Sequence, residues 1–120
     1  MVVGRKGTAL DEKLVTIDTK GHCRLSNIET GERIKETRYS TDQNAKCLKV
    51  ITDQNQSMLV INSELSRKGL LTFIDIETFK VVNEVNLHHW AADITFNKRC
   101  NRLLAVTENG TIMYSKLWSK

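Results

Sequence analysis

The sequence contains no proline and no apolar run near the roughly 18 residues that a membrane-spanning helix requires. Its longest apolar clusters are short, as at residues 58–61 and 103–106. The first residues combine two valines with charged residues, so they lack the apolar core of a secretory signal and the Arg- and Ser-rich pattern of a transit peptide. We therefore expect an intracellular protein, cytoplasmic or nuclear, with no membrane partner.

Cysteine is also scarce, with three residues, Cys23, Cys47 and Cys100. No two of them have the two-residue spacing of a zinc knuckle or a redox motif. We expect reduced thiols that pack in the core.

What is present is typical of one globular domain. The 120 residues are 40% hydrophobic and 27% charged, with the two signs of charge mixed, which excludes a disordered or collagen-like chain. Eighteen basic and fourteen acidic residues give a formal net charge of +4. This balance mildly favours an acidic partner.

Internal repeats give the strongest signal in the sequence. Segments around Gly21, Gly69 and Gly110, which lie 48 and 41 residues apart, each consist of an apolar strand, a polar turn that ends in glycine, and an alternating strand. The tripeptide Ile-Glu-Thr occurs at residues 28–30 and again at 76–78, also 48 residues apart. A period of about 40 to 50 residues built from short strands is typical of propeller blades.

Further strands are expected between these segments. Residues 31–37 and 79–87 alternate as outer strands do, and residues 44–52 and 90–96 are short and rich in small residues, as expected near a central axis. We therefore predict three strands in the first unit, four in the second and three in the last. Val2 and Val3 offer a remnant of an inner strand for the first unit.

The residues resemble the repeats of WD-repeat β-propellers. The run KGHCRLSNIETG at 20–31 is similar to the family consensus, and residues 88–118 are similar to the stretch that starts at the Gly-His signature of the family. In the first run, six positions match in type: Gly21, Cys23, Leu25, Ile28, Thr30 and Gly31. At the Trp-Asp pair of the family the three units have Ser26-Asn27, Ile74-Asp75 and Ser115-Lys116. The repeats are therefore degenerate, and a propeller of the bacterial YVTN type is an alternative.

The resemblance implies an all-β fold, namely a partial β-propeller of antiparallel four-stranded blades in an incomplete ring. A blade remnant is expected at 1–36, a full blade at 44–87 and a partial blade at 90–118. Closed propellers have four to eight blades, so this chain alone is too short to close a ring. We expect it to be part of a longer propeller chain. The alternatives are self-association through open blade edges and docking on other protein subunits.

No arrangement of residues indicates catalysis, a cofactor or a metal site. His88 and His89 are adjacent, so on a strand they point to opposite faces. No pair of carboxylates is brought to one cleft, and the glycines near the start form no phosphate loop. The aspartates Asp18, Asp75 and Asp93 are expected to cap turns. We therefore expect no enzymatic activity.

Loops that enter inner strands and loops that join second and third strands are expected to meet at one rim. The loop 62–68 is the longest of the second kind, and added loop length often carries binding specificity. The candidate partner-binding residues are Lys20, Ser63, Glu64, Arg67, Lys68, His88, His89 and Trp90. The cations would meet an acidic peptide or a phosphate. The rings of Trp90 and Trp118 are expected to pack between blades.

These observations predict a non-catalytic scaffold for protein–protein interaction within an intracellular multi-subunit complex. The alternative is an RNA-associated propeller subunit that binds nucleic acid through basic rim loops. RNA binding that falls steeply with added salt would distinguish the second from the first.

Overall fold

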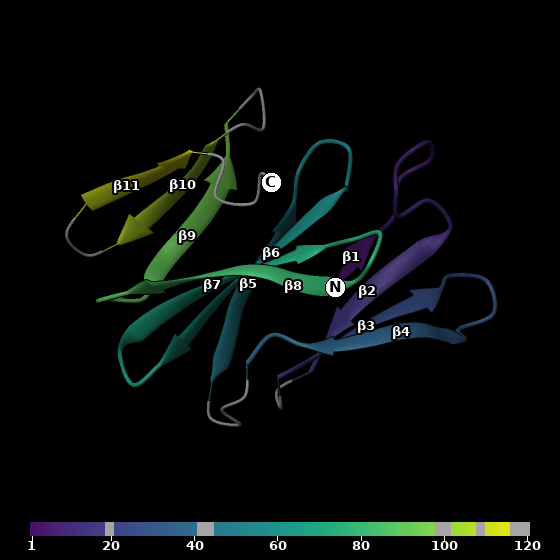
Figure 1. The fold of residues 1–120 in the computed structure, drawn as a ribbon, viewed down its shortest axis with the longest axis horizontal. Helices are drawn as coiled ribbons and strands as arrows, with labels where there is room; N and C mark the ends of the chain where they lie inside the picture. The colour runs from purple at the N-terminus through teal and green to yellow at the C-terminus, as the bar shows by residue number, and fades with distance from the viewer. Residues whose placement is uncertain (19–20, 41–44, 98–101, 108–109, 116–120) are drawn as a thin grey trace.

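The computed structural model describes residues 1–18, 21–40, 45–97, 102–107 and 110–115, with the side chains of 111–115 excepted. In this part of the chain the regular structure is entirely β, in three antiparallel sheets (Figure 1). No helix that could cross a membrane occurs among these residues. The expected all-β class is confirmed.

Each sheet is a meander in chain order. Sheet A contains β1 (Val2–Val3), β2 (Lys13–Ile17), β3 (His22–Asn27) and β4 (Arg33–Arg38). Sheet B contains β5 (Lys46–Thr52), β6 (Met58–Leu65), β7 (Lys68–Asp75) and β8 (Lys80–Leu87). Sheet C contains β9 (Ala91–Phe96), β10 (Arg102–Thr107) and β11 (Gly110–Ser115). The predicted count of three strands for the first unit was too low by one. The remnant strand expected at Val2 and Val3 is present as β1, which pairs with β2.

Sheet B lies between sheets A and C. The first strands of the sheets are neighbours, since β5 contacts both β1 and β9, and the outer strands β4 and β8 also touch. Figure 1 shows the sheets following one another without closing into a ring.

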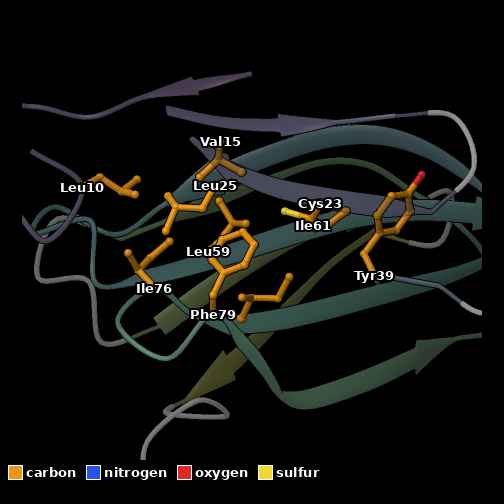
Figure 2. Packing of buried hydrophobic residues seen from close by; sticks show 10 residues of the cluster. Leu10, Val15, Cys23, Leu25, Tyr39, Leu59, Ile61, Ile76 and Phe79 are labelled. Carbon is orange, nitrogen blue, oxygen red and sulfur yellow. The ribbon is translucent and has the colours of Figure 1, made fainter. Parts of the chain in front are cut away.

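Sheet B is therefore buried on both faces. Leu59 and Ile61 of β6 pack with sheet A residues such as Val15, whereas Met58 and Val60 pack with residues of sheet C. Figure 2 shows the first of these two cores, with side chains of both sheets meeting between the ribbons. Burial on both faces explains why residues 58–61 form a continuous apolar run rather than an alternating one.

The sequence repeat at 28–30 and 76–78 corresponds to a repeated turn. The Gly31 amide donates to the Asn27 carbonyl at 2.8 Å, and the Phe79 amide donates to the Asp75 carbonyl at 2.7 Å. Gly31 and Phe79 both have positive φ, at 73° and 56°. The turns β3–β4 and β7–β8 are therefore the same structure, 48 residues apart.

Two expectations about sheet B were wrong. Residues 62–68 form no long loop, because β6 continues to Leu65 and only Ser66 and Arg67, with φ of 51° and 68°, connect it to β7. The polar residues of this stretch do not mark a loop. Asn62 and Ser63 are buried in β6, and their side chains donate to the carbonyls of Ala91 and Leu70.

Gly69 is also not a turn glycine. It lies inside β7, and its φ is not in the positive range. Glycine is needed here for space, because a Cβ would come within 2.9 Å of the Trp90 Cα.

Candidate functional site

The connection between β8 and β9 lies against the turn between β6 and β7. The Trp90 amide donates to the Arg67 carbonyl at 3.1 Å. The absence of a side chain at Gly69 permits this contact, because a Cβ there would lie only 2.9 Å from the Trp90 Cα. The two kinds of loop that the sequence assigned to one rim therefore meet here.

A pocket opens beside this contact. It has a volume of about 250 Å³ and is lined by His89, Trp90, Ala92 and Thr107, which we call the Trp90 pocket. The side chains come from the β8–β9 connection, from β9 and from the end of β10. Trp90 is 40% exposed, so the expectation that it packs between sheets was wrong for this residue. Its ring forms part of a surface that a partner can reach.

Asn62 anchors the start of β9 near this pocket. Its side chain is fully buried, and its Nδ2 donates to the Ala91 carbonyl at 2.8 Å. The Asn62 Oδ1 accepts no hydrogen bond in the described part of the chain. Sequence reasoning placed Asn62 in a solvated loop, and only the packing of sheet C against sheet B assigns it this role.

The predicted rim residues separate into three groups. Arg67, Lys68, His88, His89 and Trp90 are exposed at or beside the two connections. Ser63 is buried and Glu64 is partly buried in β6, so these two do not belong to a rim loop. Lys20 lies outside the described residues, as do Cys100 and Trp118.

The charge beside the Trp90 pocket is positive. Neither Arg67 nor Lys68 takes part in the ion pairs found among the described residues. Both side chains are exposed, so a partner can approach their charged groups. The pocket therefore combines an accessible indole ring with nearby unneutralised cations.

A separate charged cluster lies on the face of sheet A that points away from sheet B. Asp18 accepts from the His22 Nδ1 at 3.1 Å and from Arg24 at 3.0 Å, and Arg24 lies 3.6 Å from Glu36. Arg33 donates to the other oxygen of Glu36 at 2.8 Å. Their side-chain exposures lie between 25% for His22 and 31% for Arg24 and Glu36, apart from Arg33 at 58%, so we assign the cluster a bracing role for β2, β3 and β4.

Tyr39 joins this region to sheet B. Its hydroxyl donates to the Asp18 carbonyl at 3.1 Å, and its own carbonyl accepts from the Thr72 hydroxyl at 3.1 Å. Burial, with smaller contributions from Cys47 and Asp18, raises the pKa of Tyr39. No local pattern indicates this link, since its two hydrogen bonds span 21 and 33 residues.

The described cysteines are packing residues. Cys23 and Cys47 are free thiols, and both contribute to the core between sheets A and B. Burial, followed by the charge of Cys47, raises the pKa of the Cys23 thiol to about 12, and burial also raises that of Cys47. A raised pKa opposes formation of the reactive thiolate. The geometry therefore favours the packing role expected from the sequence.

One ion pair connects the first strands of sheets B and C. Lys49 of β5 donates to Asp93 of β9 at 2.5 Å. This hydrogen bond and a second one from the Ile94 amide lower the pKa of Asp93. Asp93 lies inside β9, and its carboxylate accepts from the amide of the next residue, so the expectation that it caps a turn was wrong.

The described residues contain no group of three or more His, Cys, Asp or Glu that could hold a metal ion. No protein-family model matches the chain, and a search of curated proteins found no similar sequence.

Proposed function

We propose that this chain is a WD-repeat-like β-propeller segment with a non-catalytic role, and that it binds a segment of another protein at the Trp90 pocket. The segment that fits is acidic and carries a bulky apolar side chain. Such binding would serve a multi-subunit protein complex.

Support for the propeller arrangement comes from the order of the sheets. Successive antiparallel meanders stack face to face, and their first strands lie side by side. The 48-residue repeat of the β3–β4 and β7–β8 turns agrees with repeated blades.

The observation that carries the binding proposal is the exposure of Trp90 in a pocket formed by the β8–β9 connection and sheet C. Exposed aromatic rings in pockets are common anchors of protein interfaces. Ala92 offers further apolar surface, while Thr107 and His89 supply polar atoms at its border. Arg67 of the adjoining turn and Lys68 at the start of β7 would attract the acidic residues of the partner.

A peptide titration tests this proposal. One series has the same acidic nonapeptide with Phe, Leu or Ser at its central position, and binding to the full chain is followed by fluorescence anisotropy of a label on the peptide. We expect the Phe and Leu peptides to bind more tightly than the Ser peptide. Trp90→Ser should weaken binding of the Phe peptide by about tenfold or more. The amide contact with Arg67 is made by the backbone and is unaffected by this change.

Trp90→Phe and Arg38→Ser serve as controls. The first keeps an aromatic ring and should retain most of the binding, and the second removes an exposed cation from sheet A. Equal binding of the Phe and Ser peptides, or no effect of Trp90→Ser, would contradict the proposal. Binding of single-stranded RNA with a steep salt dependence, in place of peptide binding, would favour the RNA-associated alternative.

A further inference from the structure

A second pocket lies between sheets A and B, at the end of the sheets opposite to the Trp90 pocket. It has a volume of about 400 Å³, within the range of small-molecule sites. We call it the lysine pocket, and its lining includes Leu25, Ile34, Ile76, Lys13, Lys35 and Glu77. It is independent of the function proposed above, because none of these residues lines the Trp90 pocket.

An irregularity in sheet A produces the apolar part of this pocket. Lys35 pairs with Leu25, but Arg33 pairs with Ser26, so Ile34 is an extra residue in β4. A bulge of this kind redirects side chains at a sheet edge. Ile34 is 44% exposed and lines the pocket together with Leu25 and Ile76, two members of the core between the sheets. The apolar lining is therefore continuous with the core.

The charged part consists of two ammonium groups and one carboxylate. Lys35 donates to the Glu77 carbonyl at 3.2 Å, which fixes its side chain across the gap from sheet A to sheet B. Neither Lys13 nor Lys35 takes part in the ion pairs of the described residues. An ammonium group has three donors, so Lys35 retains two after this bond. The lining has a net positive charge even with Glu77 present.

We propose that the lysine pocket binds a small aliphatic carboxylate of the fatty-acid type. The carboxylate would accept hydrogen bonds from Lys13 and Lys35, and the hydrocarbon chain would cover Ile34 and the apolar lining beneath it. A charge-assisted hydrogen bond to each lysine provides orientation, and burial of the chain provides affinity.

Calorimetric titration of the full chain with octanoate tests this site. We expect one binding site with a dissociation constant of about 1 mM or tighter, as a ligand of about ten non-hydrogen atoms allows. Acetate lacks the chain, and octylamine lacks the negative charge, so both should bind at least about tenfold more weakly. Equal binding of either compound would overturn the proposal.

Variants separate the two parts of the site. Lys13→Gln with Lys35→Gln should weaken octanoate binding about tenfold or more, and Lys13→Arg with Lys35→Arg should preserve it. Ile34→Ser changes no charge and should also weaken binding. Lys68→Gln, which removes a charge beside the Trp90 pocket, and Trp90→Ser should have no effect. Octanoate binding that is unchanged in the Lys13→Gln, Lys35→Gln variant would overturn the proposal, whatever the peptide titration gives.

A carboxylate on an aliphatic group also occurs at a peptide C-terminus. N-acetyl-leucine reproduces this end of a peptide, with a free carboxylate beside a branched aliphatic side chain. We expect it to bind more weakly than octanoate, because it buries less hydrocarbon. Tighter binding of N-acetyl-leucine would overturn the assignment to a fatty-acid ligand.

Discussion

Gly69 and Trp90 are in direct backbone contact, with the Trp90 Cα at 2.9 Å from the place where a Cβ of Gly69 would lie. This contact joins sheet B to the connection that leads into sheet C. It also determines where the Trp90 ring lies in its pocket. The candidate binding surface therefore depends on Gly69, because glycine has no Cβ to push the Trp90 backbone away.

Gly69→Ala tests this dependence. The added methyl group must displace backbone atoms, so we expect a loss of about 1–3 kcal/mol in the free energy of unfolding, measured in urea. Lys68→Ala, the neighbouring exposed position, should change it by less than about 0.5 kcal/mol. An unchanged urea midpoint for Gly69→Ala would show that Gly69 and the Trp90 backbone are not in contact.

Ile76 and Ile28 provide a matched pair at equivalent positions of the repeated turn. Ile76 is 2% exposed between sheets A and B, whereas Ile28 is 45% exposed on sheet A. Ile76→Ala should cost about 2–5 kcal/mol of unfolding free energy, and Ile28→Ala less than about 0.5 kcal/mol. Equal costs in urea unfolding would mean that Ile28 is also covered, for example by another chain.

Gln56 connects the β5–β6 turn to the segment after β1. It is 4% exposed, its Oε1 accepts from the Arg5 amide at 2.7 Å and from the Thr8 hydroxyl at 2.8 Å, and its Nε2 donates to the Val3 carbonyl at 3.1 Å. Gln56→Ala leaves these groups without their partner, so we expect a loss of more than about 2 kcal/mol. Asn55→Ala, in the same turn and exposed, is the control for thermal or urea unfolding.

Asp93 should titrate below the ordinary range of an aspartate. The hydrogen bond from Lys49 is the main cause of its lowered pKa, and the Ile94 amide adds to it. Carboxyl-carbon NMR across pH 2 to 6 measures this pKa directly. Lys49→Met should move it back toward the model-peptide value of about 3.9. Because the folded-state pKa is lowered, the pair stabilises the fold above the unfolded pKa, and this contribution disappears as pH falls through the folded pKa. An unchanged Asp93 titration in Lys49→Met would contradict the ion pair.

Cys23 should resist alkylation until the protein unfolds. Its pKa is raised to about 12 by burial, so N-ethylmaleimide at pH 8 should label Cys23 in urea but not in the native protein, as measured by peptide mass spectrometry. The raised pKa also makes stability depend on pH. The contribution of Cys23 to the free energy of unfolding is fully present below the unfolded pKa of 9.0. It decreases as pH rises toward 12, because in that range only the unfolded state releases the thiol proton. Cys23→Ala should remove this part of the decrease in unfolding free energy. Rapid labelling of Cys23 in the native protein would contradict its burial.

Local pattern was sufficient to predict much of the fold. The all-β class, the positions of ten strands and the repeated turn at 28–30 and 76–78 follow from alternation, turn residues and period, which depend on neighbours in the chain. The connection that carries His89 and Trp90 was also predicted as part of a binding rim, because a break in strand pattern is visible in the residues themselves.

The tertiary structure decided which polar residues lie inside. Asn62 and Ser63 resemble loop residues because polar residues usually face water, yet both are buried in β6. The Asn62 Nδ2 donates to the Ala91 carbonyl of β9, and the Ser63 hydroxyl donates to the Leu70 carbonyl of the neighbouring strand. The close approach of Trp90 to Gly69 and the link from Tyr39 to Thr72 join residues far apart in the chain. The bulge that exposes Ile34 depends on how β4 pairs with β3. The sequence by itself determined strands and turns, because these follow local propensity. The binding surfaces arise only where residues far apart in the chain meet.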